Sequence, residues 1–398
     1  MAVSQLKDTV TQEIDRRRDE IVEMSSRLHA HPEVAFAEHN AAQWLSTWLE
    51  KNGLQVERGI ADLPTAFRAI LARGLSGPAV ALLGEYDALP KIGHACGHNI
   101  IGTASAAAAL ALARVADQLP GKIVFLGTPA EEGGGGKALM VERGVFGGLD
   151  AALMVHPGTR TRVASKALAS VTIDVEFVGR AAHAAARPEE GINALDALIL
   201  SYNNINALRQ HMRGDGRIHG IITNGGEAPN VVPSLAAGRF IVRAKDDDYL
   251  DELLEKFLAC FQAGAKATGA SFSYRMSEAR YAPMRSNAAM ERAFSENLAS
   301  LGVAIEPPDA NANRGCGSTD MGNVSQVVPS IHPSIAIAPE SVLSHSPEFA
   351  AAAISEQGHL GLLNSAKALA MTVIDLLLDP GLLARVKEEF ARVSNERV

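Results

Sequence analysis

Four segments of the chain place potential metal ligands directly after short apolar runs. The first run leads to Glu85-Tyr86-Asp87 and then to His94-Ala95-Cys96-Gly97-His98, and the second leads to Glu131-Glu132. The third run is followed by His156 and the fourth by His345. Histidine, cysteine and carboxylate side chains are common protein ligands of zinc and related divalent metals. Each residue alone would more often be an ordinary core or surface residue, but their recurrence after four runs predicts one metal centre.

The elements that must position these ligands have the pattern of an α/β layer. Residues 79–84, 123–127 and 151–155 are predicted to be buried strands, and residues 99–116 and 137–143 are predicted to be helices. Buried strands that alternate with helices indicate a largely parallel sheet. In such sheets, sites form beyond the carboxyl ends of the strands. We therefore expect the ligands to meet at one edge of the sheet.

Residues 167–281 have a different pattern, which begins with apolar residues at alternate positions from Val171 to Phe177. The predicted order of strand, helix, strand, strand, helix and strand is that of a ferredoxin-like α+β domain. After Pro283 the α/β pattern returns. The chain is therefore predicted to have a catalytic domain in two parts, 1–166 and 282–398, around an inserted domain, 167–281. The elements predicted in the last two parts are strands at 171–177, 218–223, 239–243, 271–276 and 334–338, and helices at 191–213, 247–268, 287–301 and 361–378.

Composition and charge exclude several classes of protein. The 398 residues are 47% hydrophobic and 21% charged, which is typical of a globular protein. The net charge of −8 argues against a general nucleic-acid binder. Three separated cysteines, Cys96, Cys260 and Cys316, do not suggest a disulfide framework. Residues 1–27 are predicted to form an amphipathic helix, and the apolar run 100–115 is too short to span a bilayer. We therefore expect a cytoplasmic protein without a membrane or nucleic-acid partner.

Other catalytic motifs fail on their spacing. The glycine run before Lys137 lacks the first glycine and the final serine or threonine of a phosphate-binding loop, because Glu131 and Ala138 stand there. Neither a G-x-S-x-G nor an H-E-x-x-H motif occurs. An enzyme with a nucleophilic serine or cysteine, and a nucleotide-binding regulator, are therefore not expected.

Three segments carry a family resemblance: residues 84–90 (GEYDALP), 93–99 (GHACGHN) and 131–136 (EEGGGG). They resemble the aminoacylase/carboxypeptidase metallopeptidase family, in its amidohydrolase branch of auxin-conjugate and hippurate hydrolases. Residues 84–87 and 317–325 (GSTDMGNVS) are still more similar to p-aminobenzoyl-glutamate hydrolase subunits and related dipeptidases. The resemblance covers almost the whole chain. It implies a di-metal exopeptidase-like catalytic domain, an inserted lid and dimerisation domain, and a homodimer formed through that lid.

The resemblance also implies roles for individual residues. Two divalent metal ions, zinc or manganese, would be held with Cys96 as a bridge, Glu131 would be the general base, and Asp87 would orient a ligand. His94 lies in the motif but is left outside the ligand set. The implied metal ligands are Cys96, His98, Glu132, His156 and His345.

In the inserted domain, residues 179–194 resemble the family's lid motif. The resemblance implies that His183 reaches the active site of the partner subunit and stabilises the oxyanion. From the residues alone, His183 would more often be a loop cap. The predicted substrate-binding residues are Asn230, Arg243, His219, Gly317, Ser318 and Thr319.

The leading hypothesis is an amidohydrolase that uses metal-activated water. Its substrate would be an N-acyl amino acid, an aminobenzoyl-glutamate-like conjugate or a small dipeptide. A metal-dependent deaminase or an exopeptidase could use the same centre on another bond. A non-catalytic binding subunit is a further alternative, but it would not need Glu131 as a base.

Overall fold

The computed structural model describes residues 2–72, 76–307 and 317–395, so Cys316 lies outside the described residues. These residues divide into two compact units. The first unit contains residues 2–72, 76–166, 284–307 and 320–395, and the second contains residues 167–283 and 317–319. Residues 282 and 283, which were expected in the second part of the catalytic domain, belong to the second unit.

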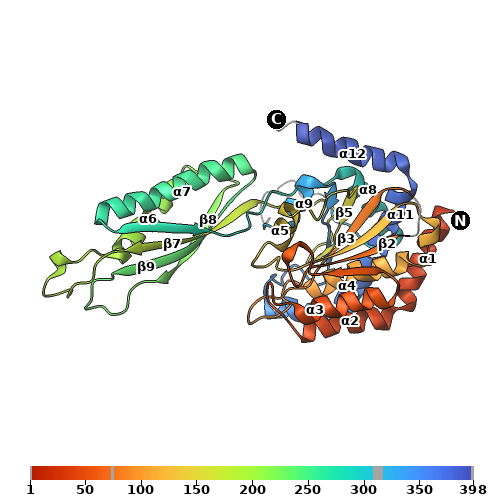
Figure 1. Ribbon diagram of the computed structural model, residues 1–398, viewed down its shortest axis with the longest axis horizontal. Coiled ribbons are helices and arrows are strands. Elements are labelled where there is room, and N and C mark those ends of the chain that lie inside the picture. Colours follow the sequence, from red (N-terminus) through yellow and green to blue (C-terminus); the bar gives the residue numbers. More distant parts are fainter. Residues whose placement is uncertain (1, 73–75, 308–316, 396–398) are drawn as a thin grey trace. The chain divides into compact units, whose positions relative to one another are not determined.

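The first unit is built on a six-stranded sheet with the order β1-β2-β4-β3-β5-β11 (Figure 1). The four strands from β4 to β11 run parallel, whereas β1 and β2 are antiparallel to their neighbours. The expected, mostly parallel sheet is therefore confirmed. The strands are β1(Gln55–Arg58), β2(Phe67–Ala72), β3(Ala79–Glu85), β4(Lys122–Thr128), β5(Ala151–Leu153) and β11(Ser330–Ile331).

Helices cover both faces of this sheet. Alternate residues of β3 point to opposite faces, so that Val80 and Leu82 belong to one hydrophobic cluster and Ala81 and Leu83 to another. The first cluster includes side chains of α1, α3, α4, α8 and α11, and the second includes side chains of α5 and α9. The helices of this unit are α1(Val3–Arg16), α2(Arg18–Ala30), α3(His39–Lys51), α4(His98–Leu112), α5(Gly136–Glu142), α8(Ala288–Ser300), α9(Met321–Val327), α10(Pro347–Ala352), α11(Glu356–Leu378) and α12(Pro380–Asn395).

The second unit is a four-stranded antiparallel sheet with the order β10-β7-β9-β8. Its elements follow one another along the chain as strand, helix, strand, strand, helix and strand. Both helices pack on one face of the sheet (Figure 1) and share its hydrophobic cluster. The elements are β7(Ala169–Val178), α6(Ala194–Arg209), β8(Arg217–Asn224), β9(Leu235–Ala244), α7(Asp247–Thr268) and β10(Ser271–Met276).

Helix α11 is long and apolar enough to cross a membrane by length and composition alone. Of its most apolar stretch, 78% is buried inside the structure, as in the core helix of a globular domain. The expectation drawn from residues 100–115 did not take this helix into account. Its burial against α4, α1 and α8 accounts for its apolar composition.

Two sequence expectations are wrong in detail. The N-terminal segment forms two helices rather than one, because the chain bends at Arg17, where φ is −94° and ψ is 11°. The strand expected at 334–338 is β12(Ser334–Ala336), which pairs with β6(His156–Gly158) in a separate two-stranded sheet. From the sequence, the apolar run of β12 could not be distinguished from a strand of the main sheet, because strands of both sheets are rich in buried apolar residues.

Candidate metal centre

The loop between β3 and α4 carries two of the predicted ligands, Cys96 and His98. Strand β3 ends at Glu85, and α4 begins at His98. Between the two ligands, Gly97 has a φ of +81°, and a Cβ atom there would lie 2.5 Å from Cγ of Pro157. Only glycine adopts this left-handed conformation readily and leaves room for the neighbouring chain.

Asp87 fixes the orientation of His98. Its Oδ1 lies 2.9 Å from Nδ1 of His98, and its Oδ2 accepts a hydrogen bond of 2.9 Å from the backbone N–H of Glu132. A carboxylate only accepts, so Nδ1 of His98 carries a hydrogen, and in the neutral ring Nε2 presents its lone pair. This Nε2 is buried and has no hydrogen-bond partner among the described residues. Such an arrangement is typical of an imidazole that binds a metal ion.

His156 is held in the corresponding way by the backbone. Its Nδ1 lies 2.6 Å from the carbonyl oxygen of Pro157, and its Nε2 lies 3.4 Å from Sγ of Cys96. Because the carbonyl oxygen can only accept, Nδ1 donates and Nε2 of His156 also presents a lone pair. His156 opens β6, three residues beyond the end of β5.

Glu132 and His345 complete the predicted ligand set. Glu132 lies in the turn after β4, and its Oε1 is 3.4 Å from Nε2 of His345. His345 has a φ of +62°, and its backbone N–H donates a 3.0 Å hydrogen bond to the carbonyl of Ala95. The loop that carries His345 is thereby attached to the loop that carries Cys96.

The structure brings all five predicted ligands and Glu131 together. Within each of three groups, the ligand atoms lie within 4.8 Å of one another. Cys96, His98 and Glu132 each belong to two of the groups. The chemistry of these donors fits divalent metal ions, as does Nε2 of His98, which makes no hydrogen bond among the described residues. The groups are Cys96 with His98 and His156, Cys96 with Glu132 and His345, and His98 with Glu131 and Glu132.

Burial is the largest single influence on the pKa of each of three titratable side chains of the centre. It raises the pKa of the Cys96 thiol. Burial also raises the pKa of Glu131 well above its ordinary value, and the nearby carboxylates of Glu85 and Asp320 add to this effect. At Glu132 burial opposes ionisation, yet the hydrogen bond from His345 and the charge of His98 lower the pKa to about 2.

A buried charged cluster beside Glu131 was not predicted. Nζ of Lys137 lies 2.6 Å from Oε1 of Glu85 and 2.6 Å from Oδ1 of Asp320, and all three side chains are fully buried. Carboxylate oxygens of Glu85, Glu131 and Asp320 also lie within 4.8 Å of one another. Each of these residues stands in a segment that drew attention in the sequence, but only the fold brings the segments together.

Two further histidines lie near the centre. The ring of His332 packs edge-on against His156 at 5.4 Å between centroids, and it was missed because no pattern distinguishes it. His94 stacks against His29 at 6.1 Å, and burial lowers its pKa to about 3. His94 belongs to none of the ligand groups found among the described residues.

The remaining predicted site residues belong to the second unit, where they form two groups. His183 pairs with Val231, and the carbonyl of Asn230 accepts from the N–H of Ala184, so His183 and Asn230 lie close together. At the other end of β9, Nη1 of Arg243 donates to Oγ of Ser318 at 3.1 Å. His219, near the start of β8, lies at this same end, and Gly317 and Thr319 flank Ser318.

The sequence matches peptidase family M20/M25/M40 over residues 81–356. It is 41% identical to the Xaa-Arg dipeptidase of Mus musculus, in an alignment that covers 97% of this chain and 92% of that protein. It is 31% identical to one of the subunits of the p-aminobenzoyl-glutamate hydrolase of Escherichia coli (strain K12), with 96% and 94% covered.

Solved structures agree with this match in fold. The aminobenzoyl-glutamate utilization protein of Klebsiella pneumoniae superimposes with a TM-score of 0.74 at 22% identity, covering 92% of this chain and 98% of that one. A dinuclear metal-binding peptidase of Bacillus subtilis superimposes with a TM-score of 0.69 at 19% identity, covering 91% and 99%. The family resemblance expected from the sequence is confirmed.

Proposed function

Because the chain belongs to peptidase family M20/M25/M40, a family of metallopeptidases and amidohydrolases, we propose that it hydrolyses the amide bond of a small acylated amino acid or dipeptide. The observation that carries this proposal is the set of three ligand groups, two of which share Cys96, with Glu131 in the third. The relatives direct attention to two substrate classes, Xaa-Arg dipeptides and p-aminobenzoyl-glutamate.

The five ligand side chains would hold two divalent cations, with Cys96 shared between them. When bound, such cations lower the pKa of a water molecule and stabilise negative charge on a carbonyl oxygen. Thiolate and imidazole ligands favour zinc, although the carboxylates also suit manganese.

Glu131 is suited to be the general base. Its side chain is 11% exposed, and its Oε2 lies 4.0 Å from Nε2 of His98. Burial raises the pKa of its carboxyl group, and a carboxylate with a raised pKa is a stronger base toward water. Glu131 would take a proton from the attacking water and give it to the leaving amine, while Asp87 holds His98 and the backbone of Glu132 in place.

His183 is prepared to donate a hydrogen bond. Its Nδ1 accepts from the backbone N–H groups of Ala185 and Ala186, both at 3.2 Å. The hydrogen of a neutral ring is therefore on Nε2, and the side chain is exposed. Nδ1 of His183 thus caps the loop, as the residues alone suggested, whereas Nε2 could donate a hydrogen bond to the oxyanion of a substrate.

The two groups of predicted substrate-binding residues do not fit one site in one subunit. They lie at opposite ends of β9, whose ten residues span about 30 Å at roughly 3.4 Å per residue. A homodimer removes this difficulty, because one subunit could supply Arg243 and its neighbours while the partner supplies His183 and Asn230.

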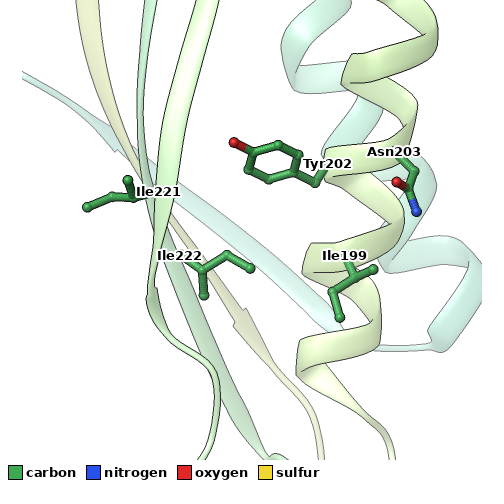
Figure 2. Close-up of a pocket in the computed structure, with 5 residues that line it drawn as sticks. All are labelled: Ile199, Tyr202, Asn203, Ile221 and Ile222. Carbon is green, nitrogen blue, oxygen red and sulfur yellow. The ribbon is translucent and has the colours of Figure 1, made fainter.

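The second unit also has a surface suited to a second copy of itself. Strand β8 is an edge strand, and Ile221 and Ile222 on it are 63% and 43% exposed. With Ile199, Tyr202 and Asn203 of α6 they line an apolar hollow of about 360 Å³ (Figure 2). An exposed apolar edge strand invites pairing, and a symmetric dimer buries it on both subunits.

Turnover by the metal-loaded protein tests the proposed reaction. The panel would contain Xaa-Arg dipeptides, p-aminobenzoyl-glutamate and N-acyl amino acids, scored for released amine. In the Glu131→Gln variant we expect at least about 100-fold slower turnover with unchanged metal content, because the amide cannot accept the proton. Near-normal turnover by this variant would remove Glu131 from the mechanism, and a panel without any product would refute the amidohydrolase.

Mixed dimers test the contribution of His183 across subunits. We expect Glu131→Gln and His183→Ala dimers to be nearly inactive, whereas co-expression should restore about a quarter of the wild-type activity, since half of the dimers then hold one complete site. Ile221→Lys should give monomers in sedimentation experiments, and Ile354→Lys, at an exposed position of the first unit, is the control. Absence of restored activity in verified mixed dimers would contradict the shared site.

A further inference from the structure

The turn that carries Glu131 and Glu132 begins in an unusual backbone conformation. Ala130 has a φ of +60°, a region in which residues other than glycine are uncommon. Its carbonyl accepts from the N–H groups of Gly134 and Gly135, at 3.1 and 2.8 Å. These bonds close the turn through the carbonyl of Ala130 but leave its N–H group free to bond elsewhere. Support for the left-handed conformation of Ala130 can therefore come from outside the turn, through this N–H group.

That support comes from Glu38, 92 residues earlier in the sequence. Oε1 of Glu38 accepts from the N–H of Ala130 at 2.9 Å and from the N–H of Phe36 at 2.9 Å. Oε2 accepts from the hydroxyl of Thr65 at 2.9 Å. The Glu38 side chain is completely buried. Because burying a carboxyl group is costly unless it is hydrogen-bonded, these three donors account for its presence there.

The same segment contacts the turn a second time through Phe36. A Cβ atom on Gly134 would lie 2.2 Å from Cε2 of Phe36, so the aromatic ring rests directly on the glycine backbone. Phe36 itself has a φ of +61°. Two residues in the left-handed conformation, Phe36 and Ala130, therefore donate to one oxygen of one buried carboxyl group.

Glu131 lies between two backbone N–H groups that are each bound by a buried carboxyl group. On its far side, the N–H of Glu132 donates to Asp87, and on its near side the N–H of Ala130 donates to Glu38. We propose that Glu38 is a positioning residue for Glu131, matching from the near side what Asp87 does from the far side. This inference rests on the proposed role of Glu131 as the base.

Loss of Glu38 should therefore act on the chemical step more than on substrate binding. A small displacement of a catalytic group is enough to slow a reaction about 100-fold. The amide oxygen that Glu38→Gln introduces could still accept from Ala130 and Phe36, so this variant should largely preserve the turn, whereas Glu38→Ala removes the acceptor.

The experiment compares three variants of the metal-loaded protein, with Glu33→Ala as the control. Glu33 also accepts from backbone N–H groups, those of Asn40 and Ala41, but these lie in the first turn of α3 and not in the turn at residues 130–136. We expect Glu38→Ala to lower kcat about 10- to 100-fold with KM within about threefold and metal content unchanged. Glu38→Gln and Glu33→Ala should stay within about threefold of wild-type kcat.

Amide hydrogen exchange gives a measurement independent of activity. Exchange at residues 130–136 should be at least about tenfold faster in Glu38→Ala, but not in Glu33→Ala. Unchanged exchange there, or an unchanged kcat in a system where Glu131→Gln is inactive, would overturn the inference. If Glu131→Gln were fully active, the base assignment would fail, and the exchange data would still decide whether Glu38 holds the turn. If Glu38→Ala does not fold, Thr65→Val, which removes one donor, replaces it in both measurements.

Discussion

At the scale of single residues, two histidines of the candidate centre are each held by a hydrogen bond at Nδ1, on the side of the ring that faces away from the centre. The carboxylate of Asp87 orients His98, and the carbonyl of Pro157 orients His156. Both rings therefore present Nε2 to the space beside Cys96. Fixed tautomers of this kind raise the basicity of metal-binding histidines and limit their motion.

Cys96 provides a prediction at this scale. Burial raises the pKa of the thiol, so an apo centre would hold it protonated, and a bound cation would favour the thiolate. Cys96→Ser should lose metal faster than the wild type during dialysis against a chelator, because a hydroxyl does not ionise as a thiol does. Elemental analysis measures the remaining metal, and Cys260→Ser is the control at a partly buried free cysteine. Full metal retention by Cys96→Ser would exclude Cys96 as a ligand.

At the scale of elements, loops after three parallel strands converge because the strands run in one direction. The loops after β3, β4 and β5 bring Asp87, Glu132 and His156 to one edge of the sheet. His345 reaches the same edge by another route, since the strand before it belongs to the two-stranded sheet with β6. The candidate ligands meet at one edge, as predicted, but the strand before His345, β12, belongs to the two-stranded sheet and not to the main sheet.

The Lys137 cluster joins elements that the sheet alone would not join. Lys137 at the start of α5 bonds to Asp320 through both its backbone N–H and its ammonium group, and to Glu85 at the end of β3. Lys137→Met should leave two buried carboxylates without a counter-charge and destabilise the protein by about 3–5 kcal/mol. Urea denaturation measures this loss, with the exposed Lys122→Met as the control. A change below about 1 kcal/mol would contradict the role of Lys137.

At the scale of the whole molecule, stability should depend on pH through Glu38. Burial raises the pKa of this carboxyl group from 4.5 to about 7, and the charge of Asp87 adds to the effect. Between pH 4.5 and about pH 7, Glu38 is therefore mostly protonated in the folded state and mostly ionised in the unfolded state. The stabilisation is complete below about pH 4.5, falls as the pH rises toward 7, and is then constant.

Glu38→Gln isolates this contribution. The difference between the two pKa values corresponds to about 3 kcal/mol. We expect the variant to gain up to that amount in free energy of unfolding relative to the wild type between pH 4.5 and pH 8, as measured by urea denaturation at both values. A wild-type and variant difference that does not change with pH would show that Glu38 titrates normally.

The sequence by itself predicted the element order of the second unit, the largely parallel sheet and the five candidate ligands that the fold brings together. These features are local: strands and helices follow from apolar periodicity, and motifs such as residues 93–99 are continuous in the chain. Glu38, Lys137 and His332 were found only in the tertiary structure. Their partners are distant in sequence, and for example 92 residues separate Glu38 from Ala130. A buried polar residue is recognised by the donors and acceptors that surround it, and only the folded chain brings these together.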